Sequence, residues 1–141
     1  MKVTAAIFFE DGKVLLMRRG PGHSAAGGWE YPGGKIEPGE TGEECLRREL
    51  QEELRIDAVI GPLAAESRRQ TDRGELHLMA YQVCSYEGTI TLTDHDRMEW
   101  VPLASLLEHD QLPSDLEISR QLVARWAGIE QNPQSERSKQ V

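Results

Sequence analysis

The sequence predicts an α/β fold in which a mixed β-sheet lies between helices. The chain has 141 residues and a mass of 15.9 kDa, which fits one domain around a single core. Strand-like runs stand before, between and after two amphipathic segments, an order that differs from the regular alternation of an all-parallel sheet. We place the folded domain at residues 1–128 and a disordered polar tail at residues 129–141.

The N-terminal part of the chain is expected to form strands joined by turns. Residues 3–9 and 14–19 are apolar runs separated by Asp11-Gly12, a typical hairpin signal, so we expect a β-hairpin. The stretch 20–28 is rich in glycine and predicts a mobile loop. Residues 29–34 then predict a short extended piece that ends where the backbone packs closely against another segment.

A helix is predicted from Thr41 to about Leu54. Thr41 and Glu44 match a capping box, and Leu46 and Leu50 fall on the same face as Leu54. The remaining segments follow the same rules of pattern and capping. Strands are expected over residues 57–63, 63–70, 76–86, 89–92 and 98–101, a short helix over 103–107, and a helix capped by Ser114 that runs to about Trp126.

Charge and composition exclude several classes of function. The chain has 16 Lys and Arg against 24 Asp and Glu, a formal charge of −8, which argues against binding to a nucleic-acid polymer. No apolar run approaches the roughly 20 residues that cross a bilayer, and the apolar start is too short for a signal peptide, so we expect a cytoplasmic protein. Cys45 and Cys84 lack the spacing of metal ligands and are expected to be small apolar fillers.

Negative charge is concentrated in residues 37–53, where seven glutamates stand against two arginines. On a helix, Glu49, Glu52 and Glu53 project within an arc of about 100°, beside the apolar stripe that contains Leu50. Like charges at these spacings repel one another. Such an arc is typical either of a solvated helix face or of a divalent-cation site at the edge of a core. The residues alone leave both interpretations open.

The pattern around these glutamates resembles the Nudix box. Five residues separate Gly34 from Glu40, and seven more separate Glu40 from Arg48-Glu49-Leu50-Gln51-Glu52-Glu53-Leu54-Arg55-Ile56. The resemblance implies a Nudix fold whose loop–helix–loop binds Mg²⁺ and cleaves nucleoside diphosphates linked to another group. Arg55 departs from the pattern, which has glycine there. We expect it to strain the helix end by about 1 kcal/mol and to leave the metal ligands intact.

The similarity extends over nearly the whole folded chain to the MutT-type nucleoside triphosphate pyrophosphohydrolases, and most to their CTP pyrophosphohydrolase branch. Enzymes of the family that act on ADP-ribose tend to have a proline after the box, and those that act on dinucleotide polyphosphates a tyrosine slightly later. Asp72-Arg73-Gly74 occupies that region here. The segments that carry the similarity are Arg18-Arg19, residues 29–37, Leu76-His77-Leu78, Asp94-His95, Glu99-Trp100 and residues 112–115.

The resemblance assigns roles to the acidic residues. Arg48 and Glu40 match positions that orient the glutamates and hold the loop, although Arg48 also fits a plain ion pair on a helix surface. The proton of the attacking water is accepted by Glu52, Glu53 or Asp94, the last of which also fits a simple polar turn. The family's metal ligands match one backbone carbonyl and three carboxylates, those of Gly33, Glu49, Glu52 and Glu53.

The resemblance also implies substrate contacts. Arg19 and Lys35 match contacts to the phosphates, Tyr31 an aromatic ring against the base, and Asp115 stands where MutT relatives have a base-reading asparagine. Plainer interpretations remain open: solvated charge for the two cations, core packing for Tyr31 and helix capping for Asp115. An ionised Asp115 suits the N–H donors of a guanine-type edge, whereas cytosine presents one donor beside an acceptor. Residues expected to be structural are His77, Trp100 and Trp126.

The implied activity is hydrolysis of (deoxy)nucleoside triphosphates to the monophosphate and pyrophosphate, with Mg²⁺, or Mn²⁺ in its place, as cofactor. CTP, dCTP or modified nucleotides are the expected substrates, and the role is sanitation of the nucleotide pool. 8-Oxo-dGTP as the main substrate is one alternative. A non-catalytic nucleotide-sensing module is another, which predicts eroded box carboxylates. The expected partner is the nucleotide, with no nucleic-acid polymer and no membrane, in a monomer or homodimer.

Overall fold

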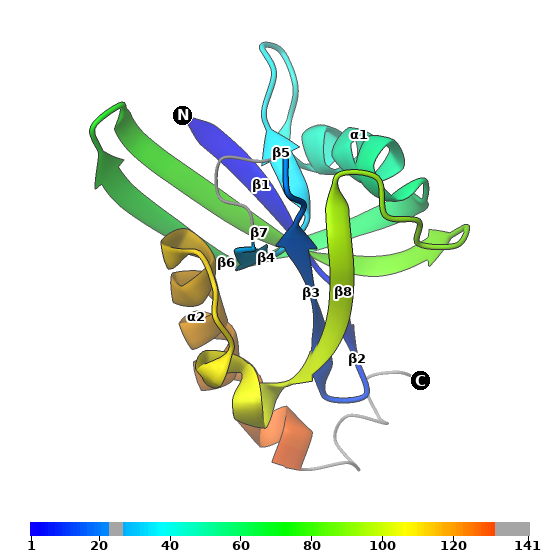
Figure 1. Cartoon of the computed structure of the whole chain (residues 1–141), viewed down its shortest axis with the longest axis vertical. Coiled ribbons are helices and arrows are strands. Elements are labelled where there is room, and N and C mark those ends of the chain that lie inside the picture. The colour runs from blue at the N-terminus through cyan, green and yellow to red at the C-terminus, as the bar shows by residue number, and fades with distance from the viewer. Residues whose placement is uncertain (23–26, 132–141) are drawn as a thin grey trace.

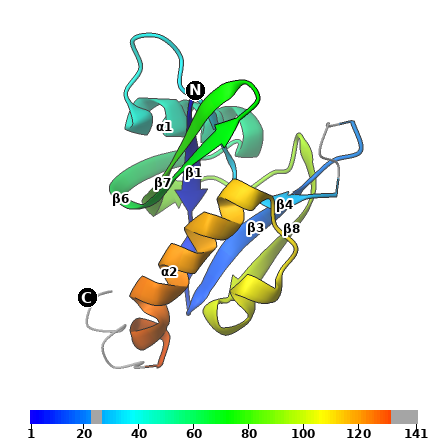
Figure 2. The ribbon, with the colours of Figure 1, turned by 90° about the vertical axis from the view of Figure 1, so that its left-hand side faces the viewer.

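The computed structural model describes residues 1–22 and 27–131, in which two β-sheets lie between the helices α1 and α2 (Figures 1 and 2). The α/β class is confirmed, although the expected single sheet is divided into two. No helix in the described ranges is long and apolar enough to cross a bilayer. The elements are β1 (Lys2–Ile7), β2 (Phe9–Glu10), β3 (Lys13–Arg19), β4 (Trp29–Glu30), β5 (Gly33–Lys35), α1 (Gly42–Leu54), β6 (Asp57–Thr71), β7 (Gly74–Glu87), β8 (His95–Pro102), the 3₁₀-helix η1 (Leu103–Glu108) and α2 (Pro113–Gln131).

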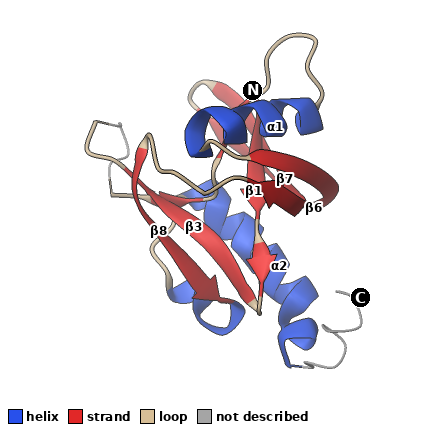
Figure 3. Ribbon diagram, turned by 90° about the vertical axis from the view of Figure 1, so that its right-hand side faces the viewer, coloured by secondary structure: helices blue, strands red, loops and turns tan. Residues whose placement is uncertain are grey.

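The two sheets differ in their pairing. One has the strand order β5-β1-β7-β6, in which β1 and β7 are parallel and the other pairs antiparallel. The other consists of β2, β3 and β4 with β8 paired to β3, all antiparallel. Figure 3 shows β3 and β8 running together, apart from β6 and β7. The chain passes between the sheets at Phe8, whose carbonyl accepts a hydrogen bond from the Leu15 N–H (3.3 Å).

Alternating residues of β1 divide the core into two clusters. Ala5 and Ile7 pack in the cluster that includes the apolar face of α2, whereas Ala6 and Phe8 pack in the cluster that includes α1. The residues of β3 alternate in the same way, which is the two-residue period of a strand. Both strands are therefore buried on both faces, which explains their uninterrupted apolar sequence.

α1 begins and ends as the sequence predicts. The Thr41 side chain accepts a hydrogen bond from the Glu44 N–H (3.1 Å), and the Glu44 carboxylate accepts one from the Thr41 N–H (2.9 Å). The helix ends at Arg55, which has φ 59° and ψ 38° and donates its N–H to the Gln51 carbonyl (3.1 Å). An L side chain thus occupies the left-handed conformation that favours glycine, as expected from the departure at this position.

The predicted hairpin of residues 3–9 and 14–19 is wrong for most of its length. β1 pairs with β5 and β7, and only Phe9 and Glu10 pair back onto β3. The turn itself is where the sequence places it, with positive φ at Asp11 and Gly12. The physical reason is that β1 buries both faces, which a two-stranded hairpin does not provide.

Three other strand predictions are corrected. Residues 57–63 and 63–70 form the single strand β6, because the irregular pairing between Ile60 and Ala65 accommodates the Gly61-Pro62 step. β6 is an edge strand, where proline is tolerated. Residues 89–92 form no strand, and their apolar side chains pack instead against the core cluster of α1. β8 accordingly begins at His95, earlier than the predicted strand 98–101.

The second helix and one cysteine also differ from expectation. α2 begins at Pro113, so Ser114 lies in its first turn instead of capping it, and proline is favoured there because its missing N–H needs no partner. α2 continues beyond Trp126. Cys45 is buried as expected, whereas Cys84 is exposed and is no core filler. The predicted short helix is η1. Residues 23–26 of the predicted loop and residues 132–141 of the predicted tail lie outside the described residues.

Replacing Arg55 with glycine is expected to raise the free energy of unfolding by about 0.5–1 kcal/mol, because glycine adopts the left-handed region without a Cβ clash. Thermal unfolding should show this as a rise in Tm of roughly 2–5 °C. Arg55→Ala is the matched control, since it removes the same charge but keeps the Cβ, and it should gain nothing. An equal gain in both variants would assign the effect to charge instead of backbone strain.

Candidate active site

A cavity of about 520 Å³ lies where residues of both sheets meet the start of α2. Its wall mixes apolar side chains such as Leu76 and Leu78 with several ionisable ones. A concave site with a few convergent polar groups is the usual form of a small-molecule site. The ionisable lining residues are Arg19, Glu30, Glu53, Arg69, Asp94, His95 and Asp115.

Arg48 connects the loop before α1 to the carboxylates of the helix. Its Nε and Nη2 donate to the two carboxylate oxygens of Glu40 (2.7 and 3.0 Å), and its Nη1 donates to Glu49 (2.9 Å) and Glu52 (3.4 Å). The hydrogen bond from Arg48 is the main cause that lowers the Glu40 pKa to about 2. Nη2 also donates to the Lys35 carbonyl (3.3 Å). One guanidinium thus binds both the loop and Glu49.

Gly33 and Gly34 allow close contacts around β5. A Cβ on Gly33 would lie 2.0 Å from the Thr4 carbonyl oxygen of β1, and a Cβ on Gly34 would lie 2.2 Å from the Glu49 Cδ. A side chain at Gly33 would therefore force the backbones of β5 and β1 apart, and one at Gly34 would displace the end of the Glu49 side chain. The Gly33 backbone also acts to lower the pKa of Glu53. The contacts of the two glycines thus bring together Gly33, Glu49 and Glu53, three of the predicted metal ligands.

Glu53 has the most perturbed carboxyl group of this set. Burial is the largest cause, and the carboxylates of Glu49, Glu30 and Asp94 add to it, so that the Glu53 pKa rises to about 8. Its Oε2 is buried and has no hydrogen-bond partner within residues 1–22 and 27–131. A buried carboxylate among like charges is a group that a cation would stabilise.

The oxygen donors of Gly33, Glu49, Glu52 and Glu53 suit a divalent cation, although these groups do not converge on one point in the structure. In the part of the chain that the structure describes, no three His, Cys, Asp or Glu side chains form a ready metal site. Glu49 is engaged by Arg48, and the side chain of Glu52 is 60% exposed. What fits is the chemistry of oxygen donors, with Glu49 and Glu53 partly buried and one oxygen of Glu53 unpaired.

Arg19 at the end of β3 faces the cavity, whereas Lys35 does not. The Arg19 Nε donates to Glu30 Oε1 (3.0 Å), and its Nη2 lies 2.9 Å from the same oxygen in an ion pair. The other oxygen of Glu30 lies 3.0 Å from His95 Nε2. Lys35 is exposed and does not belong to the cavity wall. Of the two predicted phosphate contacts, the structure therefore brings only Arg19 into the cavity.

Asp115, in the first turn of α2, is buried in the same cavity. Its Oδ1 accepts a hydrogen bond from the Tyr31 N–H (3.0 Å), and burial is the main cause that raises its pKa to about 7. The Tyr31 side chain is buried in the core, where its hydroxyl and that of Ser119 are 2.6 Å apart. Tyr31 therefore packs in the core, which is the plainer of the two interpretations of its sequence position. It also contributes to the cavity wall.

The structure gathers most of the predicted site around this cavity. Glu49 lies against its Gly34 wall, while Arg48, Glu52 and Lys35 are outside the lining. The predicted residues that line it are Arg19, Tyr31, Gly33, Glu53, Asp94 and Asp115.

Two lining residues have no role in the sequence-based interpretation. Glu30 and His95 are 65 residues apart in the chain and pair only because β4 and β8 flank β3. No local pattern marks such a pair. Trp100 and Trp126 pack with the two core clusters, as expected from the sequence.

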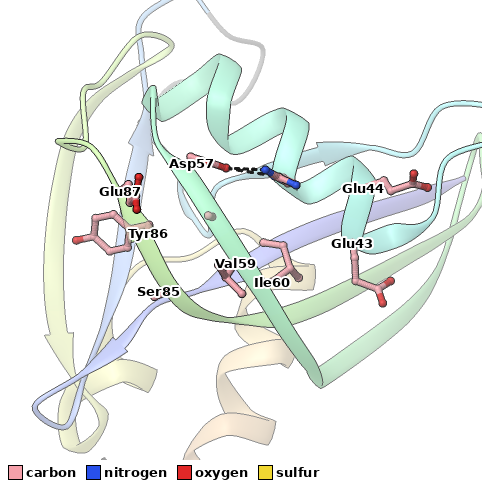
Figure 4. A pocket seen from close by; sticks show the side chains of 10 residues that line it. Glu43, Glu44, Asp57, Val59, Ile60, Ser85, Tyr86 and Glu87 are labelled. Atoms are coloured by element: carbon pink, nitrogen blue, oxygen red, sulfur yellow. Dashed lines mark hydrogen bonds and ion pairs between the residues drawn. The ribbon is translucent and has the colours of Figure 1, made fainter.

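A second cavity, of about 420 Å³, lies between α1 and the strands β6 and β7. Figure 4 shows Glu44, Asp57 and Glu87 among its lining side chains, and Arg47 pairs with Asp57 at 3.1 Å. None of the predicted metal ligands or substrate contacts lines it. We therefore place the candidate active site in the first cavity.

The chain is similar to known proteins in sequence and in fold. The NUDIX domain matches residues 1–125. The chain is 36% identical over 124 residues to the CTP pyrophosphohydrolase of Escherichia coli K12, covering 88% of this chain and 92% of that protein. It is 36% identical over 116 residues to the putative 8-oxo-dGTP diphosphatase 2 of Mycobacterium tuberculosis, covering 80% and 81%. The solution structure of the E. coli ORF135 protein superposes with a TM-score of 0.82 at 35% identity, covering 90% of this chain and 91% of that one.

Metal-free protein is expected to lose stability as the pH rises from about 5 to about 8. The Glu53 pKa is about 8 in the folded chain against an ordinary value of 4.5, so the folded state holds a proton that the unfolded state has released. The free energy of unfolding is therefore highest at the acidic end of this window and falls through it. Asp115, with a pKa of about 7, acts in the same direction.

Urea unfolding in the presence of EDTA at about pH 5, 6.5 and 8 measures this loss. Glu53→Gln has no proton to release there and should lose less stability than the wild type. Glu43→Gln makes the same chemical change at an exposed position of α1 and should follow the wild type. Identical pH slopes for the wild type and Glu53→Gln would exclude Glu53 as the source.

Proposed function

The chain belongs to the Nudix family and is a Nudix hydrolase, and we propose that it converts (deoxy)nucleoside triphosphates to the monophosphate and pyrophosphate. The proposed substrates are CTP, dCTP or modified nucleotides, with 8-oxo-dGTP as the second candidate. The proposed role is to remove such nucleotides from the cytoplasmic pool. One observation carries the proposal: Glu53, with a buried and unpartnered carboxylate oxygen, lines the same cavity as Arg19 and Asp115.

We assign Mg²⁺ as the cofactor, held by the Gly33 carbonyl and the carboxylates of Glu49, Glu52 and Glu53. When bound, such an ion neutralises phosphate charge and lowers the pKa of water that it coordinates. The chain's own contribution is to keep the carboxylates together despite their repulsion. Arg48 does this by binding Glu49 directly and by holding Glu40 on the loop.

The remaining site residues divide the work of hydrolysis. Arg19 faces the cavity with a guanidinium that suits phosphate oxygens. Glu53 and Asp94 line the same cavity and are proposed to accept the proton of the attacking water, with Glu52 as a further candidate. Once a cation balances its charge, the Glu53 carboxylate is ionised at neutral pH and able to accept that proton.

Asp115 is proposed to read the base. An ionised carboxylate accepts hydrogen bonds only, which suits the N1–H and N2–H₂ donors of 8-oxo-guanine. A protonated carboxyl group offers one donor and one acceptor, which suits cytosine N3 and N4–H₂. Because the Asp115 pKa is about 7, both forms are populated near neutral pH. Asp115 is therefore compatible with both candidate substrates, which are those named for the relatives from E. coli and M. tuberculosis.

A panel of nucleotides tests the proposed function. With Mg²⁺, the protein is expected to release pyrophosphate from CTP, dCTP, 5-methyl-dCTP or 8-oxo-dGTP, and to act more slowly on ADP-ribose. In ¹⁸O-labelled water the label should enter pyrophosphate, because the proposed attack is on the β-phosphorus. Label found only in the monophosphate would place the attack on the α-phosphorus. A panel without any pyrophosphate release would refute the proposal.

Glu53→Gln is expected to lower kcat by at least about 100-fold with little loss of fold, because a neutral amide replaces a charge needed mainly in the transition state. Steady-state kinetics at saturating Mg²⁺ measures this, with circular dichroism as the check on folding. Glu43→Gln is the matched control on the same helix and should retain wild-type turnover. Near-normal turnover of Glu53→Gln would remove Glu53 from the active site.

Asp115→Ala is expected to lower kcat/KM for the preferred base by more than about tenfold and to reduce selectivity among bases, because a charged hydrogen bond is lost. In the wild type, kcat/KM for CTP relative to 8-oxo-dGTP should fall as the pH rises through about 7, since ionisation removes the donor that cytosine needs. Asp115→Asn keeps one donor and one acceptor and should abolish that pH dependence. An equal loss for every base would make Asp115 a helix cap only.

A further inference from the structure

His95, Glu30 and Arg19 form a chain of hydrogen bonds along the wall of the cavity. His95 Nε2 lies 3.0 Å from Glu30 Oε2, and Glu30 Oε1 accepts a hydrogen bond from the Arg19 Nε (3.0 Å) and lies 2.9 Å from the Arg19 Nη2. Burial deepens along the chain, since the exposed fractions of the side chains are 31% for Arg19, 17% for Glu30 and 4% for His95. All three residues line the cavity.

The fold brings these residues together through irregular strand pairing. Arg18 lies opposite Arg97, but Arg19 lies opposite His95, so Asp96 is the extra residue of a bulge on β8. Asp96 uses that position to bind Arg18 through both carboxylate oxygens (2.8 and 2.9 Å). The bulge therefore lets Asp96 bind Arg18 while the preceding residue, His95, contacts Glu30, the acidic partner of Arg19.

The tautomer of His95 follows from what surrounds its ring. His95 Nδ1 is buried and has no hydrogen-bond partner among residues 1–22 and 27–131. An unpaired buried N–H is more costly than an unpaired lone pair, so the ring proton belongs on Nε2, where the Glu30 carboxylate accepts it. Both oxygens of Glu30 are then satisfied, and its carboxylate has one orientation.

Glu30 must be held because Arg19 has other acidic neighbours. The carboxylates of Asp115 and Glu53 also act on the Arg19 guanidinium. If Glu30 lost its bond to His95, one of its oxygens would be buried without a partner and the carboxylate would be free to turn. Arg19 would then be shared among three carboxylates instead of being fixed by one.

We propose that His95 is a positioning residue, which fixes the Glu30 carboxylate so that Arg19 is presented in one orientation to the triphosphate of the substrate. The inference rests on the proposed function for the identity of the ligand. His95 also follows Asp94, whose carbonyl accepts a hydrogen bond from the Gly20 N–H (3.3 Å). The His95–Glu30 and Gly20–Asp94 hydrogen bonds therefore both fix the start of β8 against the end of β3.

The chain provides a matched control in a second histidine–glutamate pair. His77 Nε2 lies 3.1 Å from Glu66 Oε2, and His77 is buried to a similar degree, as expected for a structural histidine. His77 does not line the cavity, and no arginine is bonded to Glu66 in the described residues. The effect of losing a buried histidine–glutamate bond can thus be compared between His95, whose partner binds Arg19, and His77, whose partner does not.

The Arg19 Nε–H signal in ¹⁵N NMR spectra tests the positioning directly, without any enzyme assay. The wild type should show this proton protected from exchange with water, identified by its absence in Arg19→Lys. His95→Leu should weaken or shift the signal, and His95→Gln, whose amide can donate from nearly the same place, should restore it. His77→Leu should leave it unchanged. An unaltered Arg19 signal in folded His95→Leu would overturn the inference.

Kinetics then tests the consequence for substrate. His95→Leu should raise KM for the triphosphate by about tenfold while kcat changes by less than about threefold, and His95→Gln should stay within about threefold of the wild type in both. If His95→Leu does not fold, His95→Asn replaces it, because its shorter amide does not reach Glu30. A loss confined to Tm, with KM unchanged, would make His95 purely structural. If the wild type hydrolyses no nucleotide but the Arg19 signal responds as expected, the proposed function is wrong, whereas the positioning of Arg19 by His95 and Glu30 is supported.

Discussion

The Glu49 carboxyl group lies directly against the backbone of Gly34, where a Cβ would come within 2.2 Å of it. This contact places the Glu49 carboxyl group against β5, and β5 is in turn paired to β1 through Gly33 and Gly34. The helix approaches the sheet because Leu46, Leu50 and their neighbours bury the adjacent face. Apolar packing therefore fixes the backbone of α1, and Arg48 orients the Glu49 carboxylate that the helix carries.

Electrostatic repulsion opposes the clustering of carboxylates that this packing produces. Within one short segment the fold collects Glu40, Glu49, Glu52 and Glu53 and offers Arg48 as their shared partner. Arg48 is occupied by the first three, which leaves Glu53 buried, without its own cation and with a raised pKa. Proteins usually retain an unfavourable buried charge of this kind only where function requires it. A charge imbalance of this kind marks the site more clearly than the shape of the cavity does.

The sequence predicts features encoded by neighbouring residues and fails where the partner is distant. The capping box and the limits of α1 follow from local spacing, and the left-handed conformation at Arg55 follows from the glycine that the resemblance implies there. The structure has each of them. The pairing of β1 does not follow, because an apolar run followed by Asp11-Gly12 has the same local signature whether it forms a hairpin or joins two sheets.

The candidate site divides in the same way. Resemblance identifies the box residues and Asp115, but Glu30 and His95 depend on strand neighbours that no short pattern reveals. The burial of Tyr31 follows from its contacts with Ser119 and the α2 cluster, which are equally distant in sequence. What escapes the sequence is thus mainly the set of contacts that connect separate elements.

The two halves of the cavity are supported by different cores. Glu53 belongs to α1, whose apolar residues pack in one cluster, and Asp115 belongs to α2, whose apolar residues pack in the other. Figure 2 shows the two helices at separate places on the sheets. Because each half depends on its own cluster, substitutions that repack the surroundings of Asp115 need not disturb Glu53 or Gly33. The fold thereby allows the half that contains Asp115 to change while the half that contains Glu53 is kept, which is how one scaffold can accommodate different sites.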